Sequence, residues 1–208
     1  MYDRETQSLW HHLTGEPVLG LLATSGLRLK VLPVVVTTWK EWRDEHPDTR
    51  VLDLKTGYVR DYRPGRPYGT YFASPDTMFP VGPRSDRLAT KAFVLAVRIG
   101  EARKAFPLDV LAREPVVNDR VGATNVVVLG KPEARSGRAY QRDALTFQAG
   151  RSPHELIDAA TGAAWRVEEE RLVHPGTGRT LPRVGAHVVY WFGWYAFHPD
   201  AEVYGVPR

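Results

Sequence analysis

The chain has 208 residues, 43% of them hydrophobic and 25% charged, with a formal net charge of +4 and no cysteine. This composition is that of an ordinary globular protein and excludes intrinsic disorder; without cysteine the chain has no disulfide, thiolate metal site or cysteine nucleophile. The charge is mild and scattered, so we expect no nucleic-acid partner.

No apolar run approaches the roughly 20 residues of a membrane helix, so no membrane span is expected. The first five residues include Asp3 and Glu5 and have no apolar core, so they do not form a signal peptide, and as written the chain should be cytoplasmic. The sequence has two methionines and 16 prolines, a composition typical of thermophilic proteins. The alternative interpretation is a GC-rich genome, which would give the same composition.

The first predicted elements lie in residues 1–52. Asp3 and Thr6 precede Trp10 in a short polar turn, which favours a hairpin. Thr38-x-x-Glu41 is a capping box and a proline follows the segment, so a short helix is predicted there.

Residues 53–92 are rich in proline, glycine and tyrosine and are predicted to be a long connection. Asp53–Tyr58 has the composition of a polar turn with a glycine. Arginines alternate with tyrosines over Arg60–Tyr71; such a segment can stack on bases, or it can be a loop with solvated arginines, which is the interpretation we favour.

Short strands are predicted through most of residues 93–208, with a turn at Gly100 and a short helix opened by Pro107. The expected strands are Phe93–Ile99, Glu101–Phe106, Val116–Val117, Asn125–Leu129, Arg138–Gln141 and Leu145–Gln148. A hairpin is predicted over Leu156–Trp165. Val188–Phe197 is aromatic on every side of a helix, which indicates a helix that is buried or at an interface.

Two spaced motifs recur along the chain. Asp3-x-x-Thr6-x-x-x-Trp10 returns 155 residues later as Asp158-x-x-Thr161-x-x-x-Trp165. Trp39-x-x-Trp42-x-x-x-His46-Pro47-Asp48 returns 152 residues later as Trp191-x-x-Trp194-x-x-x-His198-Pro199-Asp200. The repeat predicts a duplicated module, with residues 1–52 as the C-terminal half of a first copy, 53–92 as a connection and 93–208 as a complete second copy. Trp10 should correspond to Trp165, Trp39 to Trp191 and His46 to His198.

The chain resembles the family known as domain of unknown function 3179 over nearly its whole length. The matching segments are Met1-Tyr2-Asp3-Arg4-Glu5-Thr6, Ser8-Leu9-Trp10, Leu13-Thr14-Gly15-Glu16, Trp39-x-x-Trp42, His46-Pro47-Asp48-Thr49, Pro67-Tyr68-Gly69-x-Tyr71-Phe72, Gly100-Glu101-Ala102-Arg103-x-Ala105-Phe106-Pro107, Val116-Val117-Asn118-Asp119, Val121-Gly122 and Phe197-His198-Pro199-Asp200. The resemblance implies no activity, because the role of the family is unassigned.

Two departures from the family pattern matter. Family members usually carry a longer N-terminus and are often exported, so the resemblance implies that this chain begins inside the first copy and is exported if its gene starts upstream. The family also has a Tyr-Cys-Pro segment, whereas Gly130-Lys131-Pro132 stands at the matching place here. Thiol chemistry therefore cannot be transferred to this chain.

The candidate site residues have competing structural interpretations. A ligand cleft lined by polar-tipped aromatics is the first candidate, with the residues Asp61, Tyr62, Tyr68 and Tyr71. Asn118 and Asp119 could be a polar pair in a pocket, or the turn of a hairpin closing at Gly122, and we favour the turn. His46 and His198 could be ligands or proton shuttles, but a histidine in the last turn of a helix also favours the helix dipole, which we prefer. Neighbouring side chains on a strand point to opposite faces, so the His11-His12 pair cannot easily bind one metal. We expect no metal and no cofactor.

The sequence thus predicts a β-rich α+β fold with one tryptophan-rich helix per module. The favoured function is a ligand-binding or structural domain without assigned catalysis, with a small molecule as its partner. The alternatives are a hydrolytic or metal-assisted enzyme with its site between the modules, and a protein-interaction module that uses the aromatic C-terminal helix. The oligomeric state is undetermined by the sequence.

Overall fold

The structure is a computed structural model that describes residues 1–30, 32–63, 65–66, 68–131 and 134–206. These residues form fifteen strands in four sheets and four helices, which confirms the β-rich α+β prediction. Pro64 and Pro67 of the arginine–tyrosine segment, and Pro132 beside Lys131, lie outside the described residues. The chain divides into two compact units, residues 1–34 and 35–208.

The first unit contains one antiparallel sheet. Its strands are β1 (Tyr2–Asp3), β2 (Ser8–Trp10) and β3 (Pro17–Leu19). The predicted polar turn joins β1 to β2, because the Asp3 carboxylate accepts hydrogen bonds from the Glu5 N–H at 3.0 Å and the Thr6 hydroxyl at 2.5 Å. Trp10 is buried behind this turn.

The second unit is organised around a sheet that is covered on both faces. Its strands, in order, are β14 (Ala186–Tyr190), β4 (Phe93–Ile99), β5 (Ala102–Pro107) and β15 (Glu202–Val203). Successive side chains of a strand point to opposite faces. In β4, Val94 and Ala96 pack against the helix α4 (Trp191–Phe197), while Leu95 and Val97 enter a second core on the other face. The apolar β4 run is therefore explained by burial on both sides.

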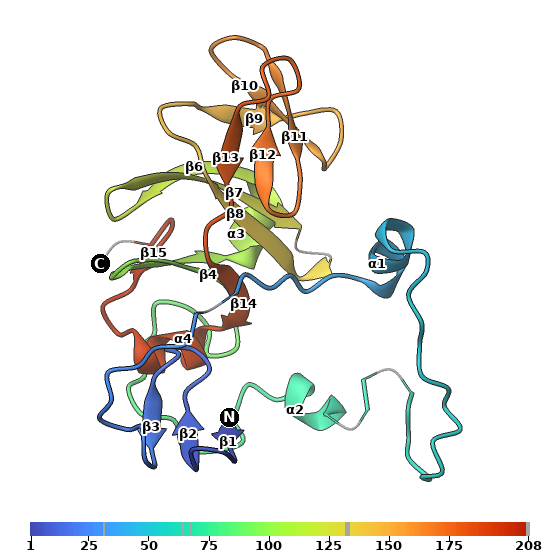
Figure 1. Cartoon of the computed structure of the whole chain (residues 1–208), viewed down its shortest axis with the longest axis vertical. Helices are drawn as coiled ribbons and strands as arrows, with labels where there is room; N and C mark the ends of the chain where they lie inside the picture. The colour runs from blue at the N-terminus through green and yellow to red at the C-terminus, as the bar shows by residue number, and fades with distance from the viewer. Residues whose placement is uncertain (31, 64, 67, 132–133, 207–208) are drawn as a thin grey trace. The chain divides into compact units, whose positions relative to one another are not determined.

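Two further sheets lie above this one in Figure 1. The three-stranded sheet has the order β6 (Val116–Val121), β7 (Thr124–Lys131) and β8 (Ser136–Gln141); the five-stranded sheet has the order β13 (Thr180–Pro182), β12 (Arg171–Val173), β11 (Ala164–Val167), β10 (Glu155–Asp158) and β9 (Phe147–Ala149). Val126 and Val128 of β7 share a core with β4 and the helix α3 (Leu108–Arg113), and Val127 points to a core with Trp165.

Residues 35–92 contain two short helices, α1 (Trp39–Glu45) and α2 (Gly69–Ala73). The predicted capping box of α1 is present, because the Thr38 hydroxyl accepts a hydrogen bond from the Glu41 N–H at 3.3 Å. The α2 helix lies inside the segment predicted as a connection. The turn predicted at Asp53 forms, with the Lys55 N–H donating to its carboxylate at 3.1 Å, but no strands flank it.

Two element predictions were wrong. Val188–Tyr190 was assigned to a helix, yet these residues continue β14 and pair with β4, and the helix begins only at Trp191. A short apolar run cannot distinguish strand from helix by periodicity, and here the β-branched valines favour the strand. Asn118 and Asp119 do not form a turn: they lie inside β6, opposite Val127 and Val126, and the turn is at Gly122, where φ is +59°.

The recurring motifs adopt the same local geometry. The Asp158 carboxylate accepts hydrogen bonds from the Ala160 N–H at 3.1 Å and the Thr161 hydroxyl at 2.5 Å, as Asp3 does in its own turn. Tyr2 pairs with Leu9, and Ile157 pairs with Ala164, which is the same register. The φ angle is positive at Gln7 (50°) and at the matching Gly162 (72°), so both turns need a left-handed residue at one position.

The two tryptophan helices also end in the same way. His46 is the C-cap of α1 with φ −132° and ψ 69°, and His198 is the C-cap of α4 with φ −137° and ψ 66°. The backbone N–H of each donates to the preceding tryptophan carbonyl, at 2.8 and 3.0 Å. Burial differs: the α1 tryptophans, Trp39 and Trp42, are 50% and 41% exposed, whereas those of α4 are 1% and 0% exposed.

Candidate functional site

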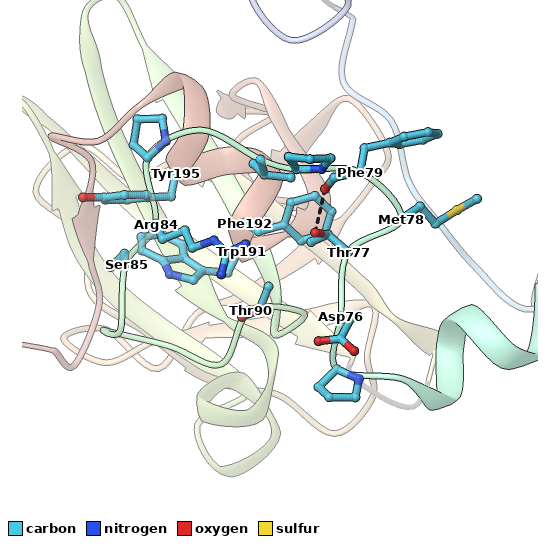
Figure 2. Close-up of a pocket in the computed structure, with 14 residues that line it drawn as sticks. Asp76, Thr77, Met78, Phe79, Arg84, Ser85, Thr90, Trp191, Phe192 and Tyr195 are labelled. Atoms are coloured by element: carbon cyan, nitrogen blue, oxygen red, sulfur yellow. Dashed lines mark hydrogen bonds between the residues drawn. The ribbon is translucent and has the colours of Figure 1, made fainter.

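A cavity of about 370 Å³ lies between α4 and the segment of residues 75–85 (Figure 2). We call it the aromatic pocket. Its lining combines aromatic rings and prolines with a few polar groups: Pro75, Asp76, Thr77, Met78, Phe79, Pro80, Val81, Pro83, Arg84, Ser85, Thr90, Trp191, Phe192 and Tyr195. A cavity of this size, in which aromatic rings and prolines stand beside polar and charged groups, can hold a small molecule.

The α4 helix forms the rigid wall of the aromatic pocket. Its first turn is hydrogen-bonded to the residues just before β4. The Trp191 N–H donates to the Ala92 carbonyl at 2.8 Å, and the Phe192 N–H donates to the Thr90 carbonyl at 3.0 Å. Trp191 is buried in the core beneath the helix, while Phe192 and Tyr195 are partly exposed and line the pocket. The helix therefore divides its aromatic side chains between the core and the cavity.

The opposite wall is held in place by Arg87. Its guanidinium donates hydrogen bonds to the carbonyls of Ala201 at 3.0 Å and Pro199 at 3.3 Å, and it lies 5.1 Å above the Trp191 ring centroid. This cation–π contact and the two hydrogen bonds fasten the end of the 75–85 segment to the loop after α4. Within the segment, the Thr77 hydroxyl donates to the Phe79 carbonyl at 2.7 Å, the dashed line in Figure 2.

Arg84 supplies an uncommitted cation to the aromatic pocket. Figure 2 shows its side chain extending past Trp191 into the cavity. Within the residues that the structure describes, its guanidinium has no hydrogen-bond or ion-pair partner. The carboxylate in the lining belongs to Asp76, which accepts a hydrogen bond from the Ser74 hydroxyl at 3.3 Å.

A second hollow of about 350 Å³ adjoins the aromatic pocket and shares Phe192 with it. Tyr68 and Tyr71, two of the four predicted cleft residues, line this hollow. Lys91 holds Tyr71 in place, because its ammonium donates to the carbonyls of Tyr71 at 2.6 Å and Ser74 at 2.7 Å at the end of α2, and lies 3.5 Å from the Tyr71 ring centroid. A cation at a helix C-terminus complements the carbonyl groups there. Burial, and to a lesser degree Tyr190, raises the pKa of Tyr71.

Asp61 and Tyr62 do not line either cavity. Asp61 forms an ion pair with Arg63 at 2.7 Å, and the hydrogen bonds from Arg63 lower the pKa of the Asp61 carboxyl. The Tyr62 hydroxyl is 2.9 Å from the Thr56 hydroxyl. The structure thus brings together two residues of the predicted cleft and leaves the other two in an exposed loop.

Asn118 and Asp119 make contacts between strands. The Asn118 amide donates to the Phe147 carbonyl at 2.7 Å and accepts from the Phe147 N–H at 2.8 Å, which joins β6 to β9. The Asp119 carboxylate lies 2.6 Å from the Lys104 ammonium on β5. Both side chains are partly buried and belong to the strand that precedes the turn at Gly122.

His46 and His198 contact the tryptophans that precede them, with ring centroids 4.1 Å from Trp42 in a tilted arrangement and 4.3 Å from Trp194 in an edge-to-face arrangement. His46 is exposed and His198 is buried. In the part of the chain that the structure describes, no three histidine, aspartate or glutamate side chains are grouped as metal ligands would be.

A larger groove of about 870 Å³ borders β7, β8 and β10. Several of its charged groups are in ion pairs: Arg138 lies 2.9 Å from Glu169, Lys131 forms an ion pair with Glu41, and Glu168 is bound by Arg171 at 3.0 Å. Because these charges neutralise one another, they are less available to a ligand than Arg84 of the aromatic pocket.

Sequence reasoning missed the wall formed by residues 75–85, together with Arg84, Phe192 and Tyr195. The available signal was the excess of aromatic residues in the last helix, since a helix with one face in the core needs fewer rings than this one carries. Those extra rings form the pocket wall. The 75–85 segment itself has no periodicity from which its position could be inferred.

None of the helices in the described residues has the length and apolar character required to cross a bilayer. The family model described as Protein of unknown function (DUF3179) matches residues 1–201 of the chain. No curated protein and no solved structure matched.

Proposed function

Because the chain belongs to the DUF3179 family, whose description assigns no activity, we propose from its own geometry that it binds a small, largely apolar molecule in the aromatic pocket. The observation that carries this proposal is the cavity of about 370 Å³ walled by Phe192, Tyr195 and the 75–85 segment. An adjoining hollow of about 350 Å³ extends the space available to a ligand.

Binding is favoured over hydrolysis by the kind of groups that line the cavity. Thr77, Ser85 and Thr90 contribute hydroxyl groups, and among the described residues of the lining there is no histidine to accept a proton from them. A hydroxyl nucleophile needs a neighbouring base. The lining otherwise supplies aromatic rings, one cation (Arg84) and one carboxylate (Asp76), which can serve as contacts for recognition.

The test is isothermal titration of the purified chain with 2-naphthamide, a neutral two-ring probe. Wild-type protein should bind it with one site per chain, and Phe192→Ala should weaken binding roughly tenfold to a hundredfold, because the variant removes about 1.5–3 kcal/mol of apolar contact. Phe197→Ala is the matched control: this ring is on the same helix but does not line the pocket. Absence of saturable binding, or equal losses in the two variants, would refute the proposal.

We propose further that residues 1–52 and 93–208 are two copies of one module, the first partial, joined by residues 53–92. Support comes from the matching turns at Asp3 and Asp158 and the matching C-caps at His46 and His198. In this scheme α1 is the equivalent of α4. Among the described residues, only the tryptophans of α4 are buried against a sheet. In this scheme only the second copy therefore forms a wall of the pocket.

A further inference from the structure

The aromatic pocket contains one cationic side chain that makes no hydrogen bond or ion pair with the described residues. Arg87, three residues along the chain, is engaged by two carbonyl groups and by the Trp191 ring, so it holds the fold together. Arg84 makes no such contact, although its side chain extends into the cavity (Figure 2). An arginine left without a partner beside aromatic rings is suited to a ligand group of opposite charge.

We propose that the ligand of the aromatic pocket is an aromatic or apolar carboxylate whose anionic group binds Arg84. This inference rests on the proposed function. The guanidinium is planar and presents paired N–H donors that match the two oxygens of a carboxylate. The rings of Phe192 and Tyr195 would contact the apolar body of the same molecule. The pocket thus separates a charged contact at one wall from apolar contacts at the other.

The competing charge in the lining is Asp76, which would favour a cationic ligand. In Figure 2 its carboxylate lies at the other side of the pocket from Arg84, and the Ser74 hydroxyl already donates to it. Its backbone N–H also donates to the Ser74 hydroxyl at 3.1 Å, so Asp76 and Ser74 form a closed local turn. The Asp76 carboxylate therefore already has a hydrogen-bond partner in its own segment, whereas the Arg84 guanidinium has none among the described residues.

The experiment compares three probes that share one ring system and carry a polar group that is anionic, neutral or cationic: 2-naphthoate, 2-naphthamide and 2-naphthylmethylammonium. Each is titrated into the full chain at low ionic strength. Naphthoate should bind about tenfold more tightly than naphthamide, because a charge-assisted pair contributes more than a neutral hydrogen bond. The preference should shrink as salt is added, because salt screens the ion pair.

Arg84→Gln should abolish the preference for naphthoate over naphthamide, and a urea unfolding midpoint equal to that of the wild type would show that the variant is folded. Arg120→Gln, an exposed arginine on β6, should retain the full preference. Equal binding of naphthoate and naphthamide by wild type, tightest binding of the ammonium probe, or a preference that survives Arg84→Gln would each overturn the carboxylate assignment while leaving the pocket a binding site. If none of the three probes binds, the proposed function fails as well.

Discussion

Trp42 and Trp194 occupy the same position in two similar helices but have different surroundings. The ring of each contacts the histidine four residues later, at centroid distances of 4.1 and 4.3 Å. Trp194 is fully buried among Val94, Ala105 and other small residues of the central sheet, whereas Trp42 is 41% exposed. Each tryptophan therefore contacts the histidine that follows it. The two differ because only Trp194 is covered by the central sheet.

This comparison gives a test of what the sheet contributes. Trp194→Ala should lower the free energy of unfolding by roughly 3–5 kcal/mol, because it removes a large ring from a packed core and leaves a cavity. Trp42→Ala should cost about 1 kcal/mol, a typical value for a partly exposed side chain. Urea unfolding curves measured for both variants would show the two midpoints. Similar losses would mean that the contact with the neighbouring histidine, rather than burial in the core, determines how much each tryptophan contributes to the free energy of unfolding.

At the scale of helices and strands, the sequence patterns predicted best those elements whose formation depends mainly on one kind of interaction. The strand Phe93–Ile99 was predicted with its observed bounds, because a short apolar run that contains β-branched residues and ends at a glycine favours a strand buried on both faces. The capping box located the start of α1 for a similarly local reason. The helix predicted over Val188–Phe197 was wrong in its first three residues, because pairing of β14 with β4 is a long-range interaction. The aromatic pocket could not be predicted, since residues 75–85 and α4 meet only in the folded chain.

Packing of α3 against β7 depends on a glycine. A Cβ atom at Gly130 would lie within 2.4 Å of the Leu111 Cβ, so no side chain fits between the helix and the strand. Gly130→Ala should destabilise the chain by about 1–3 kcal/mol through overpacking. Gly193→Ala is the control, because Gly193 lies within α4 with open space around it, and alanine there should stabilise the chain by about 0.5–1 kcal/mol. Thermal melts of the two variants should therefore shift in opposite directions, and a shift in the same direction would contradict this account of the interface.

At the scale of the whole molecule, the buried apolar residues are concentrated in the second unit. The three core clusters lie within residues 94–203, on both faces of the central sheet and beneath the five-stranded sheet. The first unit buries few large side chains in its single small sheet, chiefly Trp10 and Leu13. Since burial of apolar area is the dominant favourable term in folding, most of the stability of the chain should come from the second unit.

A chain of residues 35–208 should therefore fold without the first 34 residues. We expect a single cooperative transition in urea, because every cluster that forms a core of the second unit remains complete. We also expect 2-naphthamide to bind with unchanged affinity, because the lining of the aromatic pocket lies wholly within these residues. The matched control is a chain of residues 1–34, which has a three-stranded sheet too small to bury a core and should show no cooperative transition. Loss of the transition in the longer fragment would show that the first unit supplies an essential part of the fold.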